Sequence, residues 1–196
     1  MSVVLQDVNP FGPLVFKTHY DGWDYDEVIK AAQLLVDGTM VSESLQGGNS
    51  KSSVANEINP HRMKQFSEFY KWVTPLYNNI AKVQWDIHKN IQLYVGNSWV
   101  NYHDNTGYTK EHHHGSSVMV ITSYLNLPEN GGFIEFRDPL DGYKGFLVKN
   151  TKNSEWAGVP AKTGDVFIFP GWLRHRVQPN TSNERRWVLT TNIDIK

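Results

Sequence analysis

Three consecutive histidines, His112, His113 and His114, lie within the stretch YTKEHHHGSSV. The run is internal, which argues against an expression tag, because tags sit at chain termini. In a strand, alternate side chains share a face, so we expect His112 and His114 to point one way and His113 the other. Side chains two positions apart on a strand are about 7 Å apart along it, which lets two imidazoles lean toward one cation. A His-x-His pair alone is a weak signal, and a solvated strand end is the other interpretation.

A further histidine, His175, lies in the segment GDVFIFPGWLRHRV. The turn at Gly164 and Asp165 begins a short apolar strand, a Pro-Gly pair ends it, and His175 follows on the next predicted strand. After a loop, Arg185 and Arg186 open a final strand. This segment therefore carries a second group of residues that could bind a metal ion or an anion.

The elements that must position these residues are short strands. From about residue 91 onward, β-branched and aromatic runs alternate with turn sequences such as Asn-Gly and Thr-Gly-Asp. Short strands with close turns and no intervening helices predict an antiparallel sandwich or barrel. The expected strands cover residues 91–103, 116–127, 131–139, 142–150, 164–170 and 185–195.

The N-terminal part of the chain has a different pattern. A strand is predicted within residues 12–20, and apolar residues at helical spacing predict a helix within residues 24–38, with Gly38 as its stop. A second helical region covers residues 62–87, and we expect it to break near Pro75.

Residues 42–60, between the two helices, are rich in Ser, Gly and Asn. This composition indicates a mobile loop, either a lid over a site or a connector with no role. We expect a single domain over residues 1–196. In it, the strand and helices of 1–90 pack against a β core of 91–196 that carries the site.

The bulk composition excludes several classes of protein. Nine Phe, nine Tyr and seven Trp in 196 residues argue against a disordered chain. A net charge of −1 gives no strong nucleic-acid signal. Cysteine is absent, which excludes disulfides and thiolate metal sites. No apolar run approaches the roughly 18 residues of a membrane span, so we expect a soluble cytoplasmic protein with no membrane partner.

The order of these motifs resembles the iron(II)- and 2-oxoglutarate-dependent oxygenases. Residues 98–139 match the first half of the family pattern, with a Trp-x-Asn strand, a histidine pair, a strand ending in Tyr-Leu and a Gly-Gly hairpin. Residues 164–194 match the second half, with Gly-Asp, Phe-Pro, a distal histidine, Val-x-Pro and a basic residue. The resemblance covers roughly residues 97–195 and is nearest to oxygenases from phages and marine bacteria that are related to prolyl hydroxylases. It implies a mainly β fold, a cupin-like double-stranded β-helix or jelly roll, with the N-terminal helices packed against it.

The resemblance also implies an iron site made of a His-x-Asp pair and a distal histidine. Three ligands on one face leave open positions for the cosubstrate and dioxygen. The implied iron ligands, which are also the expected catalytic residues, are His112, His114 and His175. The family's strand ends in Tyr-Leu, which corresponds to Tyr124 and Leu125 here. Counting twelve positions back from Tyr124 identifies His112 as the first ligand. His114 then stands where prolyl hydroxylases have aspartate, and the iron is left one negative charge short.

Two alternatives to this ligand set stay open. If His114 does not bind the metal, a nearby carboxylate could complete the site, and the candidates are Glu111, Asp104 and Glu135. A second register makes His113 the first ligand and places Gly115 at the carboxylate position. Relatives that halogenate have a small residue at that position and bind chloride in the vacancy.

The distal carboxylate of 2-oxoglutarate calls for a planar, bidentate cation. Arg185 and Arg186 alternate faces, so only one of them can point into the barrel. The resemblance implies Arg186, because its spacing to Asn192 matches the family pattern, and it leaves Arg185 to solvent. Further candidate cosubstrate contacts, each of which could instead serve core packing or strand pairing, are Asn101, Thr122 and Tyr124.

The implied function is a non-haem iron dioxygenase that couples decarboxylation of 2-oxoglutarate to oxidation of a second substrate, most simply its hydroxylation. A peptidyl prolyl or other side chain is the first expectation, and the sequence does not identify the prime substrate as peptide, protein or small molecule. The alternative is a cupin-like metal- or small-molecule-binding module without oxygenase activity. The spacings from Gly107 to His114 and from Gly164 to His175 approximate the two cupin motifs. The glutamate that a cupin normally adds after the histidine pair is missing, which disfavours this alternative.

Overall fold

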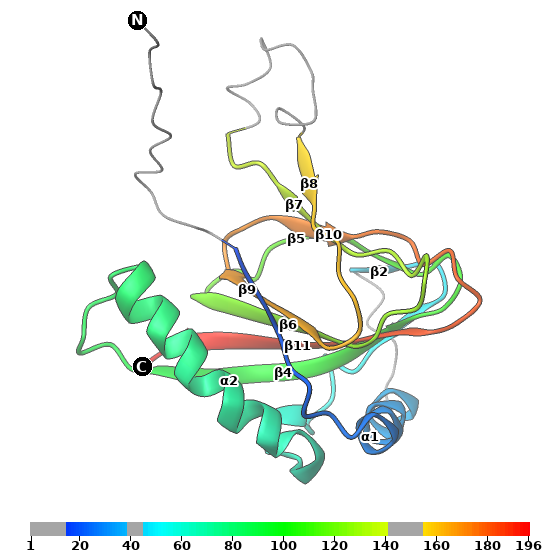
Figure 1. Cartoon of the computed structure of the whole chain (residues 1–196), viewed down its shortest axis with the longest axis horizontal. Helices are drawn as coiled ribbons and strands as arrows, with labels where there is room; N and C mark the ends of the chain where they lie inside the picture. Colours follow the sequence, from blue (N-terminus) through cyan, green and yellow to red (C-terminus); the bar gives the residue numbers. More distant parts are fainter. Residues whose placement is uncertain (1–14, 39–44, 141–154) are drawn as a thin grey trace, which may run out of the picture.

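Two antiparallel sheets dominate the structure (Figure 1), a computed structural model that describes residues 15–38, 45–140 and 155–196. The larger sheet has the strand order β1-β9-β6-β11-β4-β3, and the smaller sheet has the order β2-β5-β10-β7-β8. Together they form a jelly roll, and helices cover the outer face of the larger sheet. The mainly β fold with N-terminal helices packed against it is therefore confirmed.

The strands are β1 (Phe16–His19), β2 (Gln46–Gly47), β3 (Ser50–Ser52), β4 (Leu93–His103), β5 (Tyr108–His112), β6 (Met119–Asn126), β7 (Ile134–Arg137), β8 (Trp156–Gly158), β9 (Asp165–Pro170), β10 (His175–Val177) and β11 (Arg186–Ile195). The helices are α1 (Tyr25–Asp37) and α2 (Ser67–Asn79), with short turns at η1 (Pro60–Arg62), η2 (Lys64–Phe66) and η3 (Ile80–Gln84). The strand predicted over 142–150 lies outside the described residues. Among the described helices, none has the length and apolar character that a membrane crossing requires.

The larger sheet is buried on both faces, so it separates two apolar cores. On β11, Trp187 and Leu189 pack toward the helices, whereas Val188 packs toward the smaller sheet. β6 alternates in the same way, with Ile121 on the helix side and Tyr124 on the inner side. Because side chains alternate along a strand, every second residue of these central strands faces the space between the sheets. That space holds the candidate site.

The predicted helix over 24–38 is observed as α1. The Asp24 side chain accepts a hydrogen bond from the Glu27 backbone N–H at 3.1 Å and thereby caps the helix, which ends at Gly38. The break expected at Pro75 is wrong, because α2 continues through this residue. Val73 and Tyr77 are buried on either side of Pro75, which is itself exposed. Burial of this apolar face offsets the cost of an internal proline, about 3 kcal/mol.

The segment 45–60, expected to be part of a mobile loop, is instead tied to both sheets. β2 pairs with β5 at the edge of the smaller sheet, and β3 pairs with β4 at the edge of the larger one. Gly48, with φ +59°, makes the turn between them, where a Cβ atom would collide with the Thr106 carbonyl. The composition indicated a loop because these strands are too short and polar to show an alternating pattern, and backbone pairing supplies their order.

β1 is attached to the edge of the larger sheet through a buried carboxylate. Asp165 on β9 accepts hydrogen bonds from the Lys17 ammonium and from His19 Nδ1, both at 2.8 Å, and from the Lys162 backbone N–H at 2.9 Å. Burial raises the pKa of Asp165, but these hydrogen bonds outweigh that effect and hold the pKa below its ordinary value. The ionised carboxylate therefore stabilises the β1–β9 edge.

Replacing Asp165 with asparagine should lower the free energy of unfolding by about 1–3 kcal/mol at pH 7, because hydrogen bonds to a charged, buried acceptor are lost. A depressed carboxyl pKa stabilises the fold above the unfolded value and loses this effect as the pH falls through the folded value. The difference from the native protein should therefore begin to shrink below about pH 4 and continue to shrink as the pH falls toward the lower folded pKa. Denaturant unfolding between pH 3 and pH 7 measures it. Asp21→Asn is the control, because Asp21 also contacts His19 but is 92% exposed; an equal loss in both variants would contradict the assignment.

Candidate metal centre and adjoining pocket

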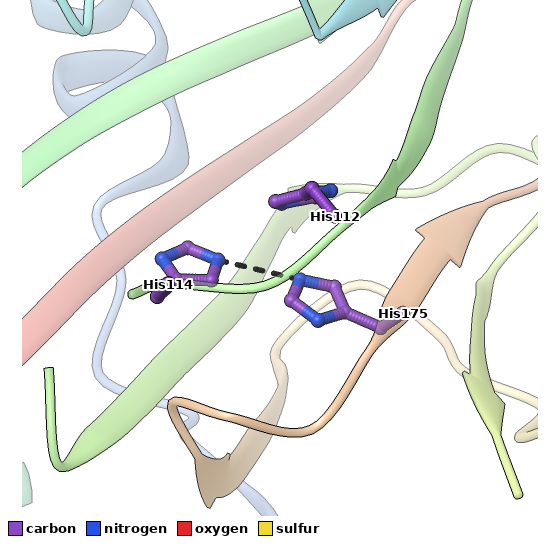
Figure 2. A group of neighbouring side chains, drawn as sticks. All are labelled: His112, His114 and His175. Atoms are coloured by element: carbon purple, nitrogen blue, oxygen red, sulfur yellow. Dashed lines mark hydrogen bonds between the residues drawn. The ribbon is translucent and has the colours of Figure 1, made fainter. Parts of the chain in front are cut away.

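Strand pairing brings together three histidines that are far apart in the sequence. β10 pairs with β5, and in this register His175 lies opposite His112. His114 follows two residues after the end of β5, and its backbone N–H donates to the Gly171 carbonyl at 2.8 Å. One ring nitrogen from each of the three side chains lies within 4.8 Å of the others. Figure 2 shows the rings pointing toward one another.

Hydrogen bonds orient each of the three rings. The Nδ1 atom of every ring faces an oxygen that accepts a hydrogen bond, so Nδ1 carries the proton and the Nε2 lone pair is free. The acceptors are Lys110 O at 2.8 Å from His112, Asn192 Oδ1 at 2.7 Å from His114, and Leu173 O at 2.9 Å from His175. Nε2 of His114 and Nε2 of His175 are 3.3 Å apart. Two lone pairs that face each other at this distance repel unless a cation lies between them.

Burial keeps these imidazoles neutral. It lowers the pKa of His114 to about 4, with the neighbouring His112 adding to the effect. The pKa of His175 is held well below its ordinary value by burial and by the other two rings, and burial also lowers the pKa of His112. Neutral imidazole is the form that binds a metal ion, so the cluster does not require deprotonation at neutral pH.

The other ligand candidates lie apart from this cluster. His113 is exposed, and its Nδ1 accepts a hydrogen bond from the Gly115 backbone N–H at 3.1 Å. The three carboxylates are each paired with arginines: Glu111 with Arg137 and Arg174, Asp104 with Arg185, and Glu135 with Arg176. Within the described part of the chain, the three histidines form the one group of three or more potential ligands, and no carboxylate joins them.

A pocket extends from the histidines into the space between the sheets. It is lined by the three histidines and by inward-facing residues of the larger sheet, namely Trp99, Asn101, His103, Thr122, Tyr124, Val188 and Thr190. The expected cosubstrate contacts Asn101, Thr122 and Tyr124 are thus all buried in one pocket. Gln46 from β2 closes part of the same pocket, so the segment 45–52 contributes to the site as fixed edge strands.

Arg186 carries a cation with no anionic partner among the described residues. The side chain is fully buried, and Nη1 donates to the Gly131 carbonyl and, at 2.9 Å, to the Gln178 carbonyl. Nη2 is buried and has no hydrogen-bond partner in the described structure. Burial lowers the pKa of Arg186 to about 10, so the guanidinium stays charged at neutral pH. A buried charge without a counter-ion costs several kcal/mol, and an anionic ligand would relieve this cost.

Two further polar groups of the pocket are suited to a carboxylated ligand. The Asn101 Oδ1 atom is buried and has no hydrogen-bond partner in the described structure; as an acceptor it calls for a donor, and the amide can serve a carboxylate only through its Nδ2 group. The Tyr124 hydroxyl accepts a hydrogen bond from the Ile134 backbone N–H at 2.9 Å. Burial raises the pKa of Tyr124 to about 12, so its own O–H proton is retained and can be donated to an anion.

Arg185, in contrast, lies at the surface. It forms a bidentate ion pair with Asp104 at 2.7 and 2.8 Å, and its guanidinium stacks 3.8 Å from the Tyr102 ring centre. The two adjacent arginines therefore face opposite sides of the strand, with Arg186 inward.

Sequence reasoning assigned no site role to His103 and used Asn192 only to count spacing. His103 is buried opposite Arg186 in the β4–β11 pair, and its Nδ1 accepts a hydrogen bond from Arg186 Nε at 3.4 Å. Its Nε2 donates toward Thr109 Oγ1 at 2.9 Å. Both residues could have been identified from the register of β11 against β4 and β6. The pattern of residues within a single strand does not reveal that register.

Residues 97–192, which include all three histidines and Arg186, match the family model described as "Putative 2OG-Fe(II) oxygenase". This segment is similar to the 2OG-Fe(II) oxygenase family. Members of this family use Fe(II), 2-oxoglutarate and dioxygen. No curated protein matches the chain in sequence.

Solved structures share the oxygenase fold. The viral collagen prolyl hydroxylase of Paramecium Bursaria Chlorella virus-1, in complex with 2-oxoglutarate, has a TM-score of 0.62 at 16% identity, over 93% of this chain and 96% of that one. A Pseudomonas putida prolyl-4-hydroxylase has a TM-score of 0.60 at 14% identity, over 92% and 91%. HygX from Streptomyces hygroscopicus, with nickel, 2-oxoglutarate and hygromycin B bound, has a TM-score of 0.60 at 9% identity, over 92% and 82%. At these identities the likeness establishes the jelly-roll fold of 2OG-Fe(II) oxygenases.

Proposed function

We propose that this protein is an Fe(II)- and 2-oxoglutarate-dependent dioxygenase whose iron ligands are His112, His114 and His175. The observation that carries the proposal is the convergence of one ring nitrogen from each of three neutral imidazoles, all within 4.8 Å, in a pocket whose lining residue His103 accepts a hydrogen bond from the buried guanidinium of Arg186. A metal ion and a dicarboxylate together would satisfy both features. The family match over residues 97–192 supports the same conclusion.

The three histidines fit Fe(II) as a facial set, because imidazole is a good ligand for iron and the three rings come from one side of the pocket. When bound, Fe(II) supplies the activation of dioxygen that the oxidation requires. The hydrogen bonds at the three Nδ1 atoms hold the tautomer and the direction of each ring, which removes the cost of orienting the ligands during binding. With no carboxylate in the ligand set, the bound 2-oxoglutarate is the main source of negative charge at the site.

We assign the distal carboxylate of 2-oxoglutarate to Arg186. Its Nη2 group and the Tyr124 hydroxyl can both donate to a carboxylate, and Thr122 can add a third hydrogen bond. Asn101, whose amide can donate through Nδ2, would bind a polar group nearer the metal. Apolar walls from Val188 and the neighbouring strands keep bulk water out, which strengthens these electrostatic contacts.

The reaction proposed is hydroxylation, in which substrate C–H, dioxygen and 2-oxoglutarate give substrate C–OH, succinate and carbon dioxide. One oxygen atom enters the new hydroxyl and the other enters succinate. A peptidyl prolyl or other side chain is proposed as the substrate class, supported by the fold shared with two prolyl hydroxylases.

Purified protein should convert 2-oxoglutarate to succinate when Fe(II) and dioxygen are supplied, even without the prime substrate. Succinate is quantified by mass spectrometry, and Zn(II) in place of Fe(II) should give none. The cupin-like alternative predicts a thermal shift with metal, no further shift with 2-oxoglutarate, and no succinate. Absence of both succinate and a metal-dependent thermal shift would reject the oxygenase proposal.

A further inference from the structure

We propose that Asn192 is the positioning residue that allows a histidine to act as a ligand where a carboxylate is expected, because its amide can either accept or donate a hydrogen bond. The inference rests on the proposed metal site and deepens it. It concerns a residue that does not itself reach the metal, and it explains how the ligand set can change from carboxylate to imidazole without a change in the surrounding strands.

Asn192 lies on a central strand of the larger sheet. β11 is paired on both sides, and Asn192 is in register with Asn97 on β4 and Val120 on β6. Its Oδ1 atom is 2.7 Å from His114 Nδ1, across 78 positions of sequence. The His114 ring, in contrast, belongs to a turn beyond the end of β5. A rigid strand therefore orients a ligand that its own loop would leave free to rotate.

The His114 ring is contacted by Asn192 at its edge and by Trp99 on its face. Trp99 on β4 stacks against it with a centroid distance of 5.7 Å and an interplanar angle of 20°. This contact limits tilting of the ring but does not choose between its two tautomers, because both present the same flat face. The hydrogen bond to Asn192 fixes the edge of the ring instead. When Nε2, which faces His175, is the metal-binding atom, Nδ1 carries the proton and Asn192 Oδ1 accepts it.

The same amide can serve a carboxylate at position 114. Nδ1 of histidine and Oδ of aspartate are both bonded directly to Cγ, so they lie at the same number of bonds from the backbone. An asparagine within reach of one is within reach of the other. Facing Nδ1–H, the amide presents its oxygen; facing a carboxylate oxygen, it presents its NH₂ group after a 180° turn about its last bond. An aspartate at position 192 has acceptors only and cannot make this change.

This reasoning predicts that one substitution has opposite effects in two backgrounds. In the native background, Asn192→Asp keeps an acceptor for Nδ1–H and makes it charged, which raises the basicity of the His114 ligand. In the His114→Asp background, the same substitution places two carboxylates against each other and removes the amide donor of Asn192. A residue that merely stabilised β11 would act in the same direction in both backgrounds.

The experiment is an anaerobic titration of the full chain with Co(II), followed by its visible absorption bands, together with thermal unfolding of each apoprotein. Asn192→Ala should weaken Co(II) binding by about 10- to 100-fold. Asn192→Asp should bind at least as tightly as the native protein. His114→Asp should still bind Co(II), and adding Asn192→Asp to it should weaken binding by about 10-fold or more. Asn126→Ala is the matched control, because it also removes one side-chain hydrogen bond, to the Arg185 carbonyl, from the same sheet.

The outcomes separate the two proposals. If native protein binds no Co(II), the metal site itself is rejected. If the native protein and Asn192→Ala bind Co(II) equally well, the role of Asn192 is rejected and the metal site stands. The same conclusion follows if Asn192→Asp changes the Co(II) affinity in the same direction in both backgrounds. Loss of Co(II) binding in Asn126→Ala to the same extent as in Asn192→Ala would also overturn the role, since the effect would then come from general weakening of the sheet.

Discussion

Replacing His175 with alanine should lower the affinity for Fe(II) by more than about 100-fold, which exceeds the usual effect of changing a residue that only supports a ligand. His175 is 3% exposed and its Nε2 faces that of His114, and among the described residues no further potential ligand joins the three histidines. The two remaining histidines could not form a three-ligand facial site, so we expect them to bind Fe(II) more weakly. Competition with a chromophoric chelator under anaerobic conditions measures the affinity.

The consecutive histidines 112–114 include a residue that serves as the control. His113→Ala should leave the Fe(II) affinity unchanged, because His113 is exposed and lies outside the cluster. His175 also packs 4.8 Å from the ring of Phe169, so its removal leaves a cavity and can lower stability. His112→Ala, at a less buried position, tests the site with less damage to the core and should show the same loss. Retention of native affinity in both His112→Ala and His175→Ala would refute the ligand assignment, and loss in His113→Ala would favour the other register.

Replacing Arg186 with methionine should weaken 2-oxoglutarate binding by roughly 30-fold or more, while Fe(II) binding remains. Removing one member of a buried, hydrogen-bonded charge pair costs about 2–5 kcal/mol, and each 1.4 kcal/mol is a factor of about ten. Methionine is long and apolar, so it fills much of the same volume. The measurement is calorimetric titration of the metal-loaded protein with 2-oxoglutarate in the absence of dioxygen.

Arg185→Met is the matched control for this prediction. It removes the adjacent arginine, whose ion pair with Asp104 is partly exposed and which does not line the pocket. The 2-oxoglutarate affinity of Arg185→Met should equal that of the native protein. If the two variants lose affinity equally, or if only Arg185→Met does, the inward assignment of Arg186 is wrong.

The choice between Arg185 and Arg186 shows where strand patterns stop being informative. In an edge strand with one buried face, alternating polarity would identify the inward residue. β11 is buried on both faces, with Trp187 and Leu189 against the helices and Val188 between the sheets. Residues 186–191 are accordingly all buried, and the sequence RWVLTTN shows no alternation of polar and apolar residues. The resemblance to a known family supplied the assignment that periodicity could not.

The two wrong expectations about the N-terminal part have a related cause. Pro75 was expected to end a helix and residues 42–60 to form a mobile loop, because local propensity favours both outcomes. Burial of Val73 and Tyr77 against the sheet maintains α2 through the proline, and pairing with β4 and β5 orders the described residues 45–52. Both are cases in which contacts distant in sequence outweigh a local preference.

The sequence by itself determined the chemical groups available: a histidine pair, a distal histidine, two candidate arginines and no cysteine, placed along a succession of short strands. It also determined that position 114 is a histidine where related patterns have aspartate. Only the tertiary structure decided that one ring nitrogen from each of the three histidines converges, that Arg186 is buried without an anionic partner among the described residues, and that Asn192 contacts His114. These facts depend on the register between strands 61 to 78 positions apart, and register is set by the packing of whole sheets rather than by the residues of any one strand.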